Sequence, residues 1–220
     1  MRPTTEDHAT RGREVQRAAV ALFAQRGFAA TGIRELASAA GMNSATLYHY
    51  APSGKEELLD AIMRLCLTEL IRRGRIAMAA STEPEEQLMG LVRAHVGTTA
   101  LNPRTATVVD QEVRSLTGRR RDEIVSLRDD YEALFSDVLA AGIARESFDV
   151  SDPTVTRLAL IEMCNGVSRW YRPDGRLSIA GVEEAFIELS RRLLRLPPST
   201  DGLTLPTDPA VQLPCEPIER

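Results

Sequence analysis

The chain has 220 residues, of which 43% are hydrophobic and 26% charged, and a formal net charge of -4 from 27 basic and 31 acidic side chains. This composition is that of a globular protein and excludes collagen, a coiled-coil rod and a largely disordered chain. Lys55 is the only lysine, so arginine supplies all the other basic side chains. The acidic balance leaves nucleic-acid binding open, because acids elsewhere in the chain can offset a basic face.

The cysteines and the hydropathy of the chain indicate in which cellular compartment the protein is found. Cys66, Cys164 and Cys215 are odd in number and widely spaced, which suits neither a disulfide framework nor a metal site. No run of about 18 apolar residues occurs, and acids stand where a signal core would lie. We therefore expect a cytoplasmic protein without a membrane span, metal or cofactor.

Helical periodicity dominates the chain. Residues 10–26 carry apolar side chains on one stripe, with Thr10 as a cap and Gly27 as the stop. Two short helices are predicted at 33–40 and 44–50, separated by a turn at Gly41. Longer helices are predicted at 53–74, 85–100, 105–115, 119–143, 152–171 and 179–196. No segment alternates as a half-buried strand does, so we predict an all-α fold of about nine helices.

The two short helices have the pattern of a helix-turn-helix. A small residue, Ala37, allows the helices to cross closely, Gly41 gives the turn its backbone freedom, and Asn43 can cap the second helix. That helix would project its exposed side chains into a major groove. Those side chains are small or polar, suited to phosphates and base edges: Ser44, Ala45, Thr46, Tyr48 and His49. Packing of the tyrosine ring in the core is the alternative for Tyr48.

The surrounding stretch, LFAQRGFAATGIRELASAAGMNSATLYHYAPSGKEELL, resembles the N-terminal domain of the TetR family of bacterial transcriptional repressors over about residues 11–63. The resemblance implies a DNA-binding domain at 10–55 and a ligand-binding and dimerisation domain at 56–196. Half of the 12 prolines fall in residues 197–220, which we predict to be a disordered tail.

Carried over residue by residue, the resemblance makes Thr31 and Tyr48 phosphate contacts and places Lys55 against the DNA backbone. It puts Arg34 on the outer face of the second helix, where it could contact a phosphate or a base. The chain departs from the family pattern at Gly32, where a hydroxyl residue is usual, and the spacing before the lysine is one residue longer.

In this family the last two long helices pair across a two-fold axis. Here those helices are 152–171 and 179–196, and we expect their apolar residues to form the dimer interface: Leu158, Ile161, Val167, Phe186, Leu189 and Leu193. The alternative is that these side chains only close the core of one protomer.

The segments QEVRSLTGRRRDEIVSLRDDYEALF and NGVSRWYRPDGRLS resemble a subgroup that responds to acyl-coenzyme A thioesters. Such a ligand needs an apolar tunnel and cations for its phosphates. The residues that we assign to this site are Phe135, Leu139, Met163, Arg169 and Trp170, with Arg172 and Arg119 to Arg121 as further cations. The alternatives are an ordinary helical core and a solvated arginine face. We expect His95 to be a core histidine and not a ligand.

Together these patterns predict a ligand-responsive repressor that binds a near-palindromic operator as a homodimer and is released by a small molecule, for which acyl-coenzyme A is one class. Two alternatives stay open: a regulator of efflux or detoxification that responds to a drug-like ligand, and a helical adaptor that binds only protein. Repression is implied by the resemblance, because it predominates in the family, and the sequence does not exclude activation. No glycine-rich phosphate loop or nucleophile motif points to an enzyme.

Overall fold

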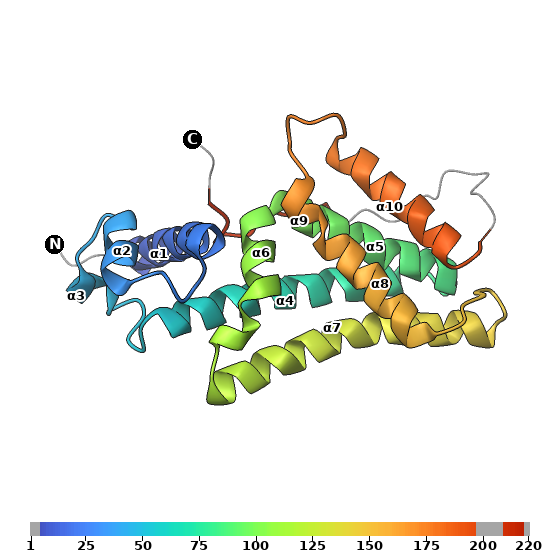
Figure 1. Cartoon of the computed structure of the whole chain (residues 1–220), viewed down its shortest axis with the longest axis horizontal. Coiled ribbons are helices and arrows are strands. Elements are labelled where there is room, and N and C mark those ends of the chain that lie inside the picture. The colour runs from blue at the N-terminus through green and yellow to red at the C-terminus, as the bar shows by residue number, and fades with distance from the viewer. Residues whose placement is uncertain (1–4, 197–208, 218–220) are drawn as a thin grey trace. The chain divides into compact units, whose positions relative to one another are not determined.

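The structure, a computed structural model, describes residues 5–196 and 209–217, with side chains from His8 onward. Within these residues it has only helices, which confirms the predicted all-α class (Figure 1). The elements are α1 (Thr5–Arg26), α2 (Ile33–Ala39), α3 (Ser44–Leu47), α4 (Lys55–Ala79), α5 (Pro84–Leu101), α6 (Pro103–Gln111), the 3-10 helix η1 (Val113–Ser115), α7 (Gly118–Ala144), α8 (Pro153–Asn165), α9 (Val167–Trp170) and α10 (Ile179–Leu193). None of the helices in these two ranges is long and apolar enough to cross a membrane.

Glycines and polar caps set the helix ends. Gly27 and Gly41 adopt positive φ angles of 80° and 67°, a backbone conformation that favours glycine, after α1 and α2. Asn43 caps α3 as predicted, since its side chain accepts a hydrogen bond from the Thr46 N–H at 2.8 Å. The predicted cap at Thr10 is wrong, because α1 begins at Thr5.

The chain divides into two compact units. The first, here the N-terminal unit, comprises residues 1–66, 104–126 and 212–220; the second, here the helical body, comprises 67–103 and 127–211. This division differs from the expected boundaries at 55 and 196, because α6 and the start of α7 group with the N-terminal helices.

The C-terminal residues 209–217 are packed, with Leu213, Cys215 and Glu216 buried. Burial of this kind contradicts the expected disordered tail for this stretch. Residues 197–208 and 218–220, the rest of that prediction, lie outside the described residues.

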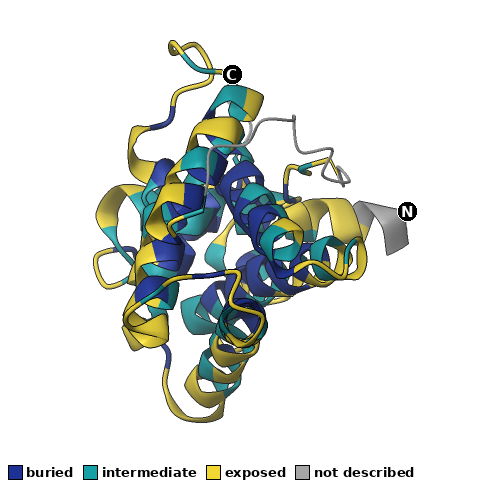
Figure 2. Cartoon of the chain, turned by 90° about the vertical axis from the view of Figure 1, so that its right-hand side faces the viewer, coloured by how far each residue is buried: buried dark blue, intermediate teal, exposed yellow. Residues whose placement is uncertain are grey.

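The N-terminal unit is built on the apolar stripe of α1. Val15, Ala19 and Phe23 are buried, α2 packs on α1, and α3 packs on α2. In Figure 2 many helices are dark blue on one side and yellow on the other, whereas α5 (Pro84–Leu101) is buried along most of its length. Burial of these stripes positions the short helices α2 and α3, which are too short to be stable alone.

In the helical body α5 is the central element, and α8, α9 and α10 pack against it. Its His95 is buried, and the His95 Nε2 lies 3.0 Å from the Asn165 Oδ1 of α8. Burial lowers the pKa of His95 to about 4 even though the bond to Asn165 opposes this shift. The imidazole is therefore neutral at pH 7, as expected for a core histidine.

Candidate nucleic-acid interface

The turn between α2 and α3 brings the two helices close together. Ala37 is buried, and the N–H of Met42 donates to its carbonyl at 2.9 Å. Leu36 and Leu47 are fully buried on the inner sides of their helices. Because Leu47 faces the core, the opposite side of α3 is turned to solvent.

The exposed side of this motif carries most of the predicted DNA contacts. Ala45, His49 and Arg34 are exposed, Ser44 and Thr46 are half-buried, and Tyr48 is 46% exposed. The exposure of Tyr48 contradicts the alternative of a tyrosine packed in the core. Arg34 makes no hydrogen bond or ion pair with the residues described, so its guanidinium can reach a phosphate. The surface therefore combines a small residue, hydroxyls, an imidazole and a cation, the groups that contact phosphates and base edges.

Two residues that were predicted to contact DNA form hydrogen bonds within the protein instead. Thr31 is 1% exposed, and its hydroxyl donates to the Gly27 carbonyl at 2.9 Å. Lys55 Nζ donates to the carbonyls of Phe28 at 2.7 Å and Thr31 at 2.8 Å, and lies 4.3 Å from the centre of the Phe28 ring. In this structure Thr31 and Lys55 hold the loop between α1 and α2, which counts against the two predicted DNA contacts.

A carboxylate holds the same loop from another side. The N–H of Phe28 donates to Glu112 at the end of α6 at 2.9 Å, and the other oxygen of Glu112 accepts from the Ser115 hydroxyl at 2.7 Å. Next to the loop, Glu35 accepts from the N–H of Gly32 at 2.9 Å, which is the half of a capping box that needs no side chain at Gly32. The contact between Phe28 and Glu112 joins residues 84 positions apart, so no local sequence pattern predicts it.

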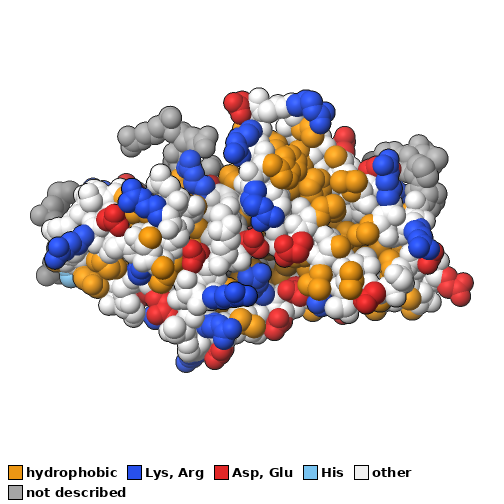
Figure 3. All heavy atoms as spheres, in the orientation of Figure 1, with side chains coloured by type: hydrophobic (Ala, Val, Ile, Leu, Met, Phe, Trp, Pro, Cys, Tyr) orange, Lys and Arg blue, Asp and Glu red, His pale blue; other side chains and the backbone are white. Residues whose placement is uncertain are grey.

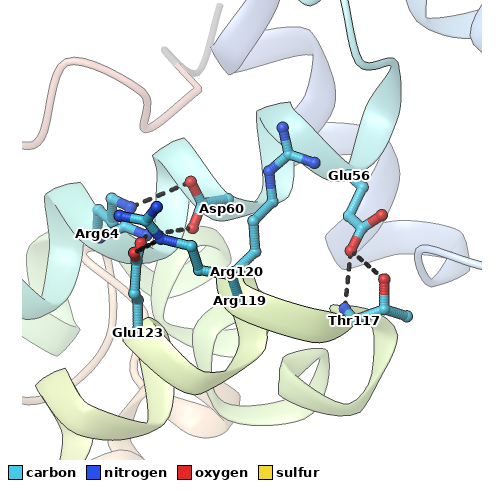
Figure 4. A pocket seen from close by; sticks show the side chains of 7 residues that line it. All are labelled: Glu56, Asp60, Arg64, Thr117, Arg119, Arg120 and Glu123. Atoms are coloured by element: carbon cyan, nitrogen blue, oxygen red, sulfur yellow. Dashed lines mark hydrogen bonds and ion pairs between the residues drawn. The ribbon is translucent and has the colours of Figure 1, made fainter.

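A charged pocket of about 530 Å³ lies in the N-terminal unit, between α4 and the start of α7 (Figure 4). Its lining contains three acids, three arginines and one threonine: Glu56, Asp60, Arg64, Thr117, Arg119, Arg120 and Glu123. Arg64 pairs with Asp60 and Glu123, and Arg119 pairs with Glu123. The hydrogen bond from Arg119 is the largest cause of a lowered pKa of Glu123. Because these acids already neutralise two of the arginines, the pocket is a poor site for phosphates, which disfavours Arg119 as a phosphate contact.

None of the five residues assigned to a ligand lines this pocket. Phe135 and Leu139 are buried in the helical body, Met163 is half-buried, and Arg169 and Trp170 are exposed on α9. The Trp170 ring is 49% exposed and stacks on Phe186, with ring centroids 6.1 Å apart.

An exposed apolar stripe runs along α8 and α10. We call it the seam, and it consists of exposed small and apolar side chains at helical spacing: Val155, Leu158, Ala159, Ala185, Leu189 and Leu193. Figure 3 shows hydrophobic side chains gathered over these helices. The structure places half of the predicted dimer residues here. It corrects the other half, because Ile161, Val167 and Phe186 are at most 9% exposed and fill the core of one protomer.

The N-terminal unit contains a helix-turn-helix whose apolar side is buried and whose polar side chains are exposed, and the helical body forms a separate unit. Together these features define a helix-turn-helix regulator of transcription. The family model described as "Bacterial regulatory proteins, tetR family" matches residues 16–62. A second model, "Tetracyclin repressor-like, C-terminal domain", matches residues 81–194. The chain belongs to the TetR family of bacterial regulatory proteins, and it is a regulator and not an enzyme.

Relatives match along most of the chain. The HTH-type transcriptional repressor KstR2 of Mycolicibacterium smegmatis is 33% identical over 196 residues, covering 86% of this chain and 93% of the relative. KstR2 of Rhodococcus jostii is 30% identical and covers 78% and 84%. The structure of the ketosteroid transcriptional regulator KstR2 of Mycobacterium tuberculosis matches with a TM-score of 0.76 at 28% identity, covering 82% and 92%. AibR, solved with isovaleryl coenzyme A and operator DNA, shares the fold at 24% identity and a TM-score of 0.71, covering 81% and 97%.

The corrected role of Lys55 gives a first prediction. We expect Lys55→Met to lower the melting temperature by about 5 °C, because loss of charged hydrogen bonds to two loop carbonyls costs about 2 kcal/mol. Lys55→Arg should also destabilise the protein, since a planar guanidinium cannot place its donors as an ammonium does. Thermal unfolding followed by circular dichroism measures both effects.

The matched control is Arg34→Met, which removes an exposed cation and should leave the melting temperature unchanged. An unaltered melting temperature for Lys55→Met, together with a DNA-binding salt slope lowered by about one, would return Lys55 to a phosphate contact.

Proposed function

We propose that the chain is a ligand-responsive transcriptional repressor that binds a near-palindromic operator as a homodimer and is released by an acyl-coenzyme A thioester of lipid, steroid or related catabolism. The observation that carries the DNA-binding part is the solvent-facing side of α3, which exposes Ala45, Tyr48 and His49 while Leu47 anchors the helix in the core. Relatives that match both domains are named repressors, which supports repression over activation.

Different residue types on α3 would contact different parts of the operator DNA. Tyr48, Ser44 and Thr46 carry hydroxyls that bind phosphates, whereas Ala45 permits close approach to base edges and His49 donates to a base. Arg34 adds a charge at the edge of this surface. Two such surfaces related by a two-fold axis would read half-sites about 34 Å apart, or somewhat more, on one face of the DNA.

We expect His49→Ala to relax base preference in one half-site position, and Arg34→Ala to weaken binding about equally on all sequences and lower the salt slope by about one. Selection from a random duplex library followed by titration at several salt concentrations measures both. Arg176→Ala, at an exposed arginine between α9 and α10, is the charge-matched control and should change neither quantity. If the parent chain selects no DNA sequence, the adaptor alternative replaces this proposal.

The seam supports dimerisation. Its side chains are exposed in one protomer although they are apolar, and they lie on two helices that share a face, which suits a four-helix interface around a two-fold axis. Leu158 and Leu189 are 45% and 47% exposed, so each has apolar area left to bury against a partner.

We expect Leu158→Asp or Leu189→Asp to convert a dimer of twice 24.2 kDa into a monomer, because a buried unpaired carboxylate opposes association. Light scattering after size exclusion measures the mass. Ile76→Asp, which places the same charge at an exposed apolar residue outside the seam, is the control and should stay dimeric. A monomeric parent chain would contradict the proposal.

The effector class rests on resemblance and on chemistry. KstR2 of Mycobacterium tuberculosis is described as a ketosteroid regulator, and AibR shows that this fold can hold a coenzyme A ester. In this chain Arg169 and Trp170 are consecutive exposed residues of α9, a cation and a ring that suit a phosphate and an adenine. A ligand that prefers one spacing of the two α3 helices would shift the dimer away from the DNA-bound state.

A panel of acyl-coenzyme A esters should contain a member that stabilises the protein by about 2.7 kcal/mol at a hundredfold excess over its Kd and releases operator DNA. Arg169→Ala should weaken that ester at least tenfold, whereas Arg176→Ala should not. Thermal shift and DNA release are the two measurements. Stabilisation by drug-like compounds but by no ester would favour the efflux alternative instead.

A further inference from the structure

The C-terminal residues 212–217, here the strap, lie within the N-terminal unit although they are the last described part of the chain. Leu213, Cys215 and Glu216 are 5%, 0% and 3% exposed. Figure 1 shows this red stretch running beside α1 and α6. Charged side chains are seldom buried without a structural reason. The strap buries one charged side chain and two apolar ones, so it is an integral part of the N-terminal unit.

Glu216 caps the N-terminus of α6 from the far end of the chain. One carboxylate oxygen accepts from the N–H of Arg104 at 3.2 Å, and the other accepts from the N–H of Thr105 at 2.9 Å and from the Thr105 hydroxyl at 2.6 Å. Arg104 and Thr105 are the second and third residues of α6, whose N–H groups have no partner inside the helix. The positive end of the helix dipole also stabilises a carboxylate at this position.

The strap also holds α1. Arg17, half-buried on α1, donates from Nε to the carbonyl of Pro214 at 3.0 Å. Thr105 contacts the buried Cys215 Sγ at 3.7 Å. One short segment therefore binds the middle of α1 through Pro214 and the start of α6 through Glu216.

The far end of α6 reaches the DNA-reading helices. Glu112, directly after α6, accepts from the N–H of Phe28 in the loop between α1 and α2. Lys55 holds two carbonyls of the same loop. The helix α2 starts at Ile33, just beyond this loop, and α3 packs on α2. A shift of α6 would therefore move the loop, and with it α2 and α3.

We propose that the strap positions α6 against α1 so that α3 is held for operator binding, with Glu216 as the positioning residue. The inference rests on the proposed DNA binding and assigns to the C-terminus a role in affinity that does not involve contact with DNA. The strap provides no exposed cation for a phosphate, so its effect is confined to how the reading surface is held.

The test compares two truncations and two substitutions. Removal of residues 212–220 deletes the strap, whereas removal of 218–220 is the matched control that keeps it. Glu216→Gln keeps the size of the side chain but turns an NH₂ group toward N–H donors, and Arg17→Met removes one donor from a half-buried site that tolerates change. Each protein is titrated with two 30-base-pair duplexes, the sequence that the parent chain selects from a random library and a scrambled version of it. The titrations are made at 20 °C, after circular dichroism has shown that the variant is folded.

We expect removal of 212–220 and Glu216→Gln to weaken binding of the selected duplex about tenfold, and Arg17→Met about threefold. Binding of the scrambled duplex should change less than twofold, and the 218–220 truncation should match the parent. A lower melting temperature with unchanged affinity for the selected duplex would overturn the proposal, because the strap would then be only a brace. Equal losses on both duplexes would overturn it too, since they indicate a direct charge contact.

Failure of the proposed function has a different result. In that case the parent chain itself selects no sequence, and the strap inference falls with it. If the parent binds and all four variants bind equally well, only the strap inference fails.

Discussion

The loop between α1 and α2 is the constraint on which the placement of the helix-turn-helix depends. The ammonium of Lys55 binds the carbonyls of Phe28 and Thr31, while Glu112 accepts the N–H of Phe28. A loop has few backbone partners of its own, so a cation on its acceptors and an anion on its donor satisfy groups that water would otherwise bind. The direction in which α2 leaves the loop follows from these contacts, and α3 follows from α2.

This arrangement explains why the chain keeps one lysine among its many arginines. An ammonium has three donors spread in a tetrahedron, which suits carbonyls that converge from different directions and the face of the Phe28 ring at 4.3 Å. A guanidinium has its donors in one plane, which suits a carboxylate. Several arginines are used in that second way, as Arg64 is with Asp60 and Glu123.

Local patterns predicted the local features well. Glycine positions, the Asn43 cap and the period of the apolar residues were enough for the helix-turn-helix, since each acts within a few residues. Contacts between distant residues could not be predicted in this way. Glu216 binds Thr105 across 111 positions, and without knowledge of that contact the proline-rich C-terminal residues were predicted to be disordered. The same limit applies to Thr31 and Lys55, whose residue types suit DNA phosphates but whose atoms are occupied by the loop.

The helices α8 and α10 show why periodicity alone could not separate core from interface. Each carries apolar residues on two sides, so Ile161 and Leu158, three residues apart on α8, are 9% and 45% exposed. The bond between the buried His95 of α5 and the half-buried Asn165 is one contact that holds α8 against α5. With its pKa lowered to about 4, His95 stays neutral at pH 7 and needs no counter-charge in the core. This polar contact lies inside the protomer, on the same helix as an apolar side that is buried, while the side that carries Leu158 stays exposed.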